Sequence, residues 1–148
     1  MLDFLAWVER LPAVGALKVS FIVYPLINAL HILAIGALVT SVILMDLRIL
    51  GLAGTALARA PFLRLMREAI AVAFPAAVLS GLALFSIRAQ EYATSPVFQI
   101  KMALLALAGL NLAAFRRLAA KAGEDGPYPA AARALAALSI ALWLGVLA

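Results

Sequence analysis

Residues 19–45 read VSFIVYPLINALHILAIGALVTSVILM and decide the fold, because they contain no charged side chain. The stretch ends at Asp46-Leu47-Arg48. A helix rises about 1.5 Å per residue, so roughly 20 apolar residues cross the ~30 Å hydrocarbon core of a bilayer. The stretch therefore predicts a transmembrane helix. His31, the only histidine of the chain, then lies at membrane depth, where ionisable groups are costly and often functional.

The composition supports the same class of protein. Of the 148 residues, 67% are hydrophobic and 13% are charged, against roughly 45–50% and ~25% in soluble domains. The absence of cysteine excludes disulfides and thiolate metal sites within the chain. The net charge of +5 does not indicate nucleic acid, because the basic residues lie in short loops beside apolar runs. We expect an all-α integral membrane protein, a four-helix transmembrane bundle with one domain over residues 1–148.

Further apolar stretches predict three more spans, over residues 69–87, 98–115 and 130–148. Pro75 should bend the first of these. Residues 2–12 predict a short N-terminal helix lying in the membrane interface. The loop at about 52–68 is expected to lie along the inner leaflet, with Pro61 in a first helical turn and Arg64 four residues before Glu68. A turn is expected at residues 123–127.

The basic residues orient the predicted bundle. The loops that follow the first and third spans carry most of them, which places these loops in the cytoplasm and both termini in the periplasm. The predicted location is the bacterial inner membrane, with several passes. One side carries Arg48, Arg59, Arg64, Arg67, Arg116, Arg117, Lys121 and Arg133, and the other carries Arg10, Lys18, Arg88 and Lys101.

Small residues recur at helix-packing intervals. Ala29, Gly36 and Thr40 share one face of the first span, and the second span offers Ala77 and Gly81. Such faces allow two backbones to approach closely inside a membrane, so they predict a compact bundle.

A polar stripe runs along the first predicted helix. Tyr24, Asn28 and His31 are four and three residues apart, so they share one face. Hydrocarbon would leave their hydrogen-bonding groups unsatisfied, and the stripe should therefore face the bundle interior or a partner chain. Ser80 and Ser139 are the expected partners at similar depth. Together these five residues form a candidate polar pocket or cofactor site.

Two interpretations of His31 remain open. In the first, a neutral imidazole bonds to Asn28, a serine or a backbone carbonyl and fixes the helix register. In the second, His31 is the axial ligand of a haem b, the one metal site that this chain offers. A single histidine would require five-coordinate iron, an unusual second ligand or a two-fold dimer. No catalytic residue is expected, because no nucleophile–base pair is present.

The end of the first span offers a second polar group. Asp46 and Arg48 predict an ion-pair cluster at the inner interface, with Gly51 ending the helix. Asn111 lies near the same level on the third predicted span.

These residues resemble a family of small bacterial four-helix integral membrane proteins of unknown function. The resemblance covers Tyr24-Pro25, Asn28, His31, Asp46 to Gly51, Gly81, Phe85, Tyr92, Pro96 to Phe98, Lys101, Asn111, Ser139 and Trp143. It implies the fold and the importance of His31, Asp46, Arg48, Lys101 and Asn111. A looser likeness extends to copper-resistance-D-type membrane domains and to diheme cytochrome b proteins, but the latter need more histidines than this chain has.

Three functions follow as hypotheses. The leading one is a non-catalytic accessory or anchor subunit with a polar pocket around His31, held in the lipid bilayer as a homodimer or in a larger membrane complex. The alternative is a haem-b redox or electron-transfer protein. A small-molecule or proton transporter comes third, because the chain shows no internal repeat.

Overall fold

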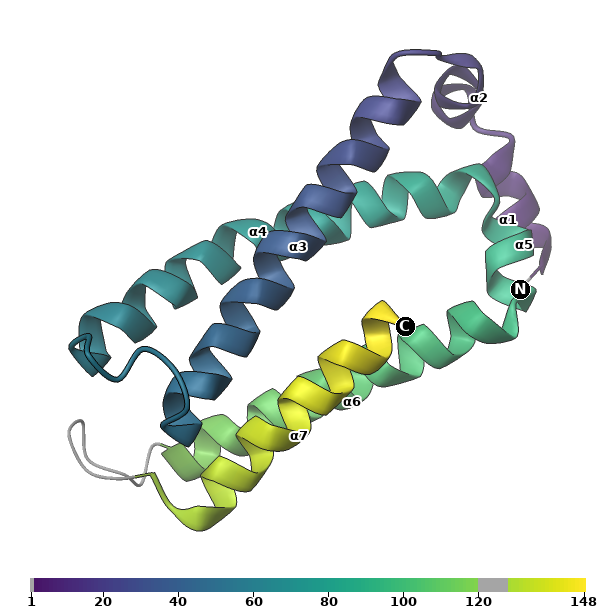
Figure 1. The fold of residues 1–148 in the computed structure, drawn as a ribbon. Coiled ribbons are helices and arrows are strands. Elements are labelled where there is room, and N and C mark those ends of the chain that lie inside the picture. The colour runs from purple at the N-terminus through teal and green to yellow at the C-terminus, as the bar shows by residue number, and fades with distance from the viewer. Residues whose placement is uncertain (1, 120–127) are drawn as a thin grey trace. The chain divides into compact units, whose positions relative to one another are not determined.

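The computed structural model describes residues 2–119 and 128–148, and every regular element in these two ranges is a helix. The predicted turn at 123–127, with Lys121, lies outside them. In chain order (Figure 1) the helices are α1 (Leu2–Glu9), α2 (Pro12–Val19), α3 (Val23–Leu50), α4 (Arg59–Ile87), α5 (Ala89–Thr94), α6 (Pro96–Ala119) and α7 (Ala130–Leu147).

Four helices, α3, α4, α6 and α7, are long and apolar enough to cross a membrane. The sequence predicted these four, but not all of their bounds. Helix α4 begins at Arg59 and continues without a break into the apolar stretch, so residues 59–68 of the loop expected at about 52–68 are instead its first part. Pro61 lies in the first turn of α4, where a missing amide hydrogen is tolerated. No other helix breaker follows until Pro75.

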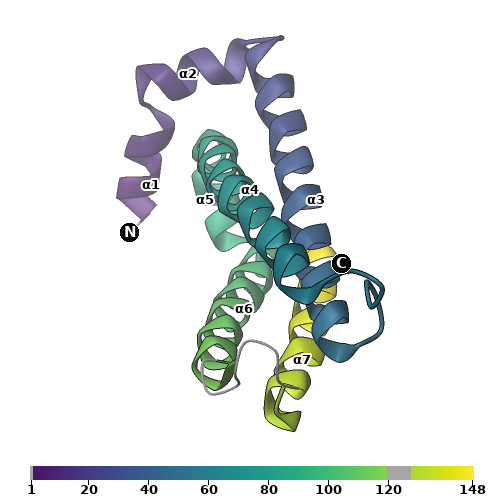
Figure 2. The same cartoon turned by 90° about the vertical axis from the view of Figure 1, so that its left-hand side faces the viewer.

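The N-terminal segment forms two short helices where the sequence predicted one over residues 2–12. The chain leaves helical geometry at Leu11, with φ −59° and ψ 136°, and Pro12 opens α2. The residue before a proline is driven out of the helical region by a clash with the proline ring, which explains the break. The chain changes direction between α1 and α2 and again between α2 and α3 (Figure 2).

Helix α3 ends as the sequence predicted, at Gly51. This glycine has φ +78°, and its amide bonds to the Arg48 carbonyl at 3.2 Å while the Leu52 amide bonds to the Leu47 carbonyl at 2.9 Å. The two bonds form a Schellman motif, which needs a left-handed residue and therefore favours glycine.

In this chain the buried side chains are mostly small and the exposed ones are large, which is the reverse of the core of a soluble protein. Of the buried hydrophobic side chains in the described ranges, seven are alanine: Ala34, Ala73, Ala77, Ala89, Ala108, Ala132 and Ala136. Large side chains point outward, for example Phe21 at 95% exposure and Leu33 at 70%. Small residues at helix contacts and large apolar residues outside are the pattern expected where the surroundings are themselves apolar.

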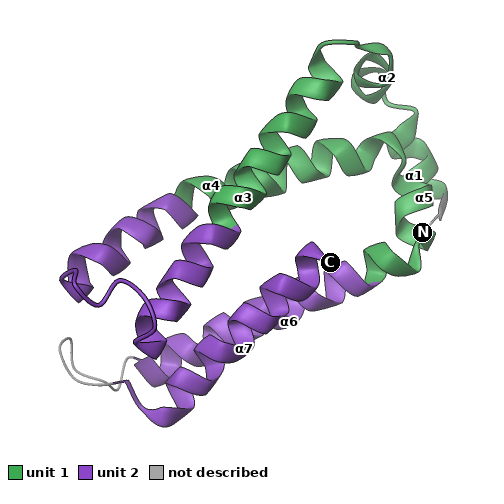
Figure 3. Ribbon diagram, in the orientation of Figure 1, with its two compact units in different colours: residues 1–38, 71–99 green, residues 39–70, 100–148 purple. Residues whose placement is uncertain are grey.

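The described chain divides into two compact units (Figure 3). The first contains Met1–Leu38 and Ala71–Gln99, and the second contains Val39–Ile70 and Ile100–Ala148. Helices α3, α4 and α6 each contribute one part to each unit.

The first unit is held at one end by an aromatic cluster and a capping bond. Rings of Phe85, Tyr92 and Phe98 lie 5.3–6.3 Å apart and join α4, α5 and α6. The Glu9 carboxylate accepts a 2.8 Å hydrogen bond from the amide of Gln90, in the first turn of α5. Because Arg88 at the N-cap gives no side-chain cap, Glu9 satisfies this helix end from a distant part of the chain.

Candidate functional site

The first unit holds His31 in a socket on α4. The His31 Nδ1 lies 3.0 Å from the Ser80 hydroxyl. A Cβ added at Gly81 would lie 2.9 Å from the His31 Cε1, so any side chain at this position would force the imidazole to move. The imidazole therefore occupies the space that Gly81 leaves open. The expected pairing of His31 with Ser80 is present in the structure, and Gly81 is what allows it.

The hydrogen bonds of Ser80 assign the tautomer of a neutral His31. A serine hydroxyl has one proton to donate, and Ser80 directs it to the Ala76 carbonyl at 2.5 Å. His31 must then donate from Nδ1, which leaves the lone pair on Nε2. Within the described ranges Nε2 has no hydrogen-bond partner.

The rest of the predicted polar stripe does not join this socket. Asn28 is exposed, and Tyr24 is 42% exposed. Tyr24 instead lines a surface cavity with Lys18 and Arg88. The small-residue face predicted on α3 is also open, because Ala29, Gly36 and Thr40 are all exposed. Of the small residues singled out on the first two spans, Ala77 and Gly81 of α4 are the ones in close packing.

Ser139 belongs to the second unit, where its hydroxyl lies near the Asp46 carboxylate. Asp46 is 7% exposed and Ser139 is 9% exposed. The sequence matched Ser139 with His31 by estimated depth, but Asp46 lies further along α3, roughly 22 Å from His31 along the helix axis.

Asp46 and Arg48 do not form the predicted ion pair. The described ion pairs are Arg64–Glu68 and Arg88–Glu91. Residues two apart on a helix point in different directions, so Asp46 and Arg48 find separate surroundings. Arg48 reaches the next loop, where it donates a 2.8 Å hydrogen bond to the Leu57 carbonyl.

Asn111 ties α6 to α7. It is 8% exposed and donates a 3.0 Å hydrogen bond to the Leu135 carbonyl, one turn before Ser139. The second unit nevertheless keeps three buried polar atoms without a partner in the described ranges, namely Asp46 Oδ2, Arg48 Nε and Asn111 Oδ1. Lys101, the remaining predicted residue, is half-buried in the second unit and makes no hydrogen bond there.

The described residues contain no group of three or more His, Cys, Asp or Glu side chains that could hold a metal ion. A haem would therefore take His31 as its one imidazole ligand, through Nε2. The sequence did not reveal the socket of Gly81, although a serine and a glycine side by side in an apolar run were its signal.

Comparisons with models of known families, with curated proteins and with solved structures found no match.

Proposed function

We propose that this chain is a non-catalytic membrane subunit, an accessory or anchor protein of the bacterial inner membrane with its termini in the periplasm. The observation that supports this proposal most strongly is that His31 takes part in the packing of two helices. Its Nδ1 is bonded to Ser80 and its ring fills the space above Gly81, which is how a polar residue fixes the register of two membrane helices. The four long apolar helices, with large side chains outside, support the membrane location.

The exposed Asn28 supports a partner within the membrane. An amide facing hydrocarbon would leave several hydrogen-bonding groups unsatisfied, and a neighbouring helix can satisfy them. Asn28 is exposed on α3, whereas Ala34 and Leu38, further along the same helix, are buried. We infer that a second protein helix covers Asn28.

Purification from native membranes in a mild detergent tests this proposal. We expect a stoichiometric partner chain, or a second copy, to remain bound. Asn28→Ala should weaken this association. Leu33→Ala is the matched control, because Leu33 is also an exposed residue of α3 but lies on a different face. Recovery of the chain alone and monomeric, with no effect of Asn28→Ala, would contradict the proposal.

The alternative is haem binding through His31, and the Nε2 lone pair favours it. A histidine that donates from Nδ1 to an oxygen presents Nε2 to a metal in the usual way. When bound, haem would supply one-electron chemistry, and Ser80 would orient the ligand ring. An absorption spectrum of the protein from haem-replete cells tests this role. A Soret band lost in His31→Ala supports it, and no band, or an unchanged one, rejects it.

A further inference from the structure

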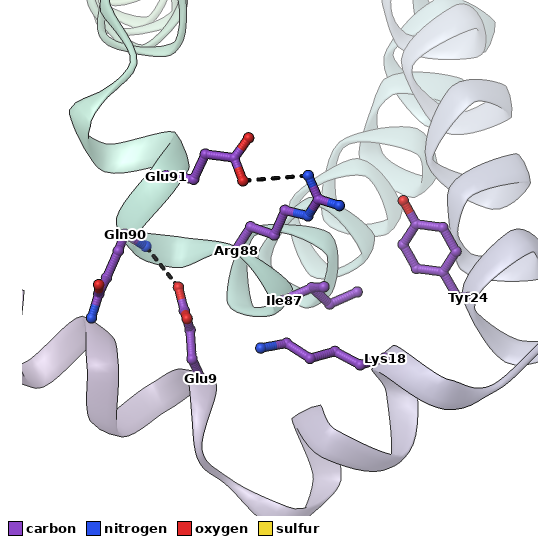
Figure 4. A pocket seen from close by; sticks show the side chains of 7 residues that line it. All are labelled: Glu9, Lys18, Tyr24, Ile87, Arg88, Gln90 and Glu91. Carbon is purple, nitrogen blue, oxygen red and sulfur yellow. Dashed lines mark hydrogen bonds and ion pairs between the residues drawn. The ribbon is translucent and has the colours of Figure 1, made fainter.

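The first unit contains a charged cavity that no part of the proposed function uses. Its volume is about 670 Å³, and it lies where α2, α3 and the α4–α5 junction meet (Figure 4). The polar residues that line it are Glu9, Lys18, Tyr24, Arg88, Gln90 and Glu91. Lys18, Tyr24 and Arg88 extend into the same space from three different elements. The cavity lies at the ends of two helices that could span a membrane.

The acidic and basic side chains of this cavity are equal in number, but several of its hydrogen-bond donors have no partner among the described residues. Glu9 is bonded to the Gln90 amide, and Arg88 pairs with Glu91 at 3.3 Å while both remain 66% exposed. Lys18 is exposed and makes no ion pair or hydrogen bond with the described residues. The Tyr24 hydroxyl likewise has no partner among them. An ammonium, a guanidinium and a phenol are therefore available together, and this donor set suits a phosphate group.

The carboxylates add a second requirement. An anion with no positive group would meet Glu91 and Glu9 beside its binding donors, and like charges repel in partly buried surroundings. A ligand that carries an amine close to its phosphate satisfies both sets, because the amine can approach Glu91 while the phosphate contacts Lys18 and Arg88. The cavity thus fits a zwitterionic aminoalkyl phosphate.

An apolar groove adjoins the charged cavity. It has a volume of about 360 Å³ and shares Lys18 and Tyr24 with the cavity, while Val19, Phe21 and Pro25 supply its apolar wall. Phe21 is 95% exposed. A soluble phosphate ester would leave this groove unused, whereas a lipid would place an acyl chain along it. The pairing of a zwitterionic cavity with an apolar groove indicates an amphiphile.

We propose that this cavity binds the headgroup of a zwitterionic phospholipid. The phosphate contacts Lys18, Arg88 and the Tyr24 hydroxyl, the amine approaches Glu91, and one acyl chain follows the groove past Phe21. The proposal rests on the membrane location proposed above. Fractionation of cells tests that location separately, because a chain found outside the membrane would refute the location before any lipid is measured.

Native mass spectrometry of the full chain, released from detergent micelles, tests the lipid site. Phosphatidylethanolamine and phosphatidylglycerol of matched acyl chains are titrated in parallel. We expect phosphatidylethanolamine to be retained more tightly, and Lys18→Glu to weaken its binding about tenfold, because one charge-assisted contact becomes repulsive. Tyr24→Phe should weaken it about threefold, through loss of one neutral hydrogen bond.

Arg10→Glu is the matched control. Arg10 is exposed at the α1–α2 junction and does not line the cavity, so the same charge reversal should leave lipid retention unchanged. Circular dichroism confirms that each variant keeps its helices. Equal retention of both lipids, or equal losses in Lys18→Glu and Arg10→Glu, would overturn the proposal. So would glycerophosphoethanolamine binding as tightly as the lipid, since that result would assign the cavity to a soluble phosphate ester.

Discussion

The two units treat their buried polar groups differently. In the first, the Nδ1 of His31 meets the Ser80 hydroxyl at 3.0 Å and the ring fills the space over Gly81. In the second, Asp46 and Asn111 each keep one buried oxygen without a partner in the described chain. A buried polar atom without a hydrogen bond reduces stability, and native proteins retain such atoms mainly where they have a use. The His31–Ser80 hydrogen bond of the first unit thus serves packing, and the buried polar groups of the second keep hydrogen-bonding capacity.

The chain provides a separate reporter for each unit. Its two tryptophans are Trp7, in the first unit, and Trp143, in the second. Trp143→Phe leaves Trp7 as the only tryptophan, and Trp7→Phe leaves Trp143. Unfolding in mixed micelles, followed by fluorescence in each background, can assign a change in stability to one unit.

The largest expected effect comes from Gly81→Leu. The new side chain would displace His31 from its socket and break the bond to Ser80, with an expected loss of roughly 2–3 kcal/mol in the free energy of unfolding. Trp7 should report it. Gly109→Leu is the control in the second unit, because nothing lies within 4 Å of a Cβ at Gly109. Equal losses in the two variants would show that the socket contributes nothing.

Next in size is the contrast between Ser80→Ala and Asn111→Leu. Ser80→Ala leaves His31 Nδ1 without its partner and should cost about 1–2 kcal/mol. Asn111→Leu removes one hydrogen bond to the Leu135 carbonyl but also removes the unpartnered Oδ1. The two changes offset each other, so we expect less than about 1 kcal/mol. A larger loss from Asn111→Leu than from Ser80→Ala would reverse the assignment of roles to the units. Both are measured by the same unfolding experiment.

A smaller effect is expected where backbone geometry alone differs. Gly51→Ala in the second unit should cost about 1 kcal/mol, because φ +78° disfavours a side chain even where space is free. The same substitution at Gly15, inside α2 of the first unit, should raise stability by up to about 1 kcal/mol. Thermal unfolding by circular dichroism measures both. A gain in stability for Gly51→Ala would show that the Schellman turn is dispensable.

The smallest effects should come from the exposed ion pairs, one in each unit. Glu68→Gln and Glu91→Gln break pairs at 2.9 Å and 3.3 Å whose side chains are all more than 60% exposed. Water screens such pairs, and each change should cost less than about 0.5 kcal/mol. Chemical unfolding at low and high salt checks this. A salt-dependent loss above 1 kcal/mol in either variant would indicate a charge network larger than the visible pair.

The sequence predicted what depends on local pattern. The four apolar helices follow from runs of uncharged residues, the end of α3 follows from Gly51, and the match of His31 with Ser80 follows from equal depth. All three use spacing along the chain and the preferences of single residues. The helix break at Leu11 was also readable, since Pro12 follows it, although the prediction of one helix over 2–12 missed it.

What the sequence could not supply is the rotation of each helix about its axis. Ser139 lies near Asp46 in the second unit, and Asn28 is exposed although it shares a face with His31. The neighbour of Ser139 depends on how far α7 is displaced along its axis relative to α3, and the exposure of Asn28 depends on which face of α3 meets α4. A hydrophobic run carries little information about either. The bond from Gln90 to Glu9 is of the same kind, because it joins residues 81 positions apart.

That long-range bond imposes an order on biosynthesis. While the first apolar helix leaves the ribosome, the Glu9 carboxylate has no amide N–H from which to accept this bond, because Gln90 has yet to be translated. Helices α1 and α2 can then dock only after α3 and α4 have been made and α5 has emerged. Docking of the N-terminal segment is therefore a late event of assembly, and it can report that the chain has been completed as far as α5.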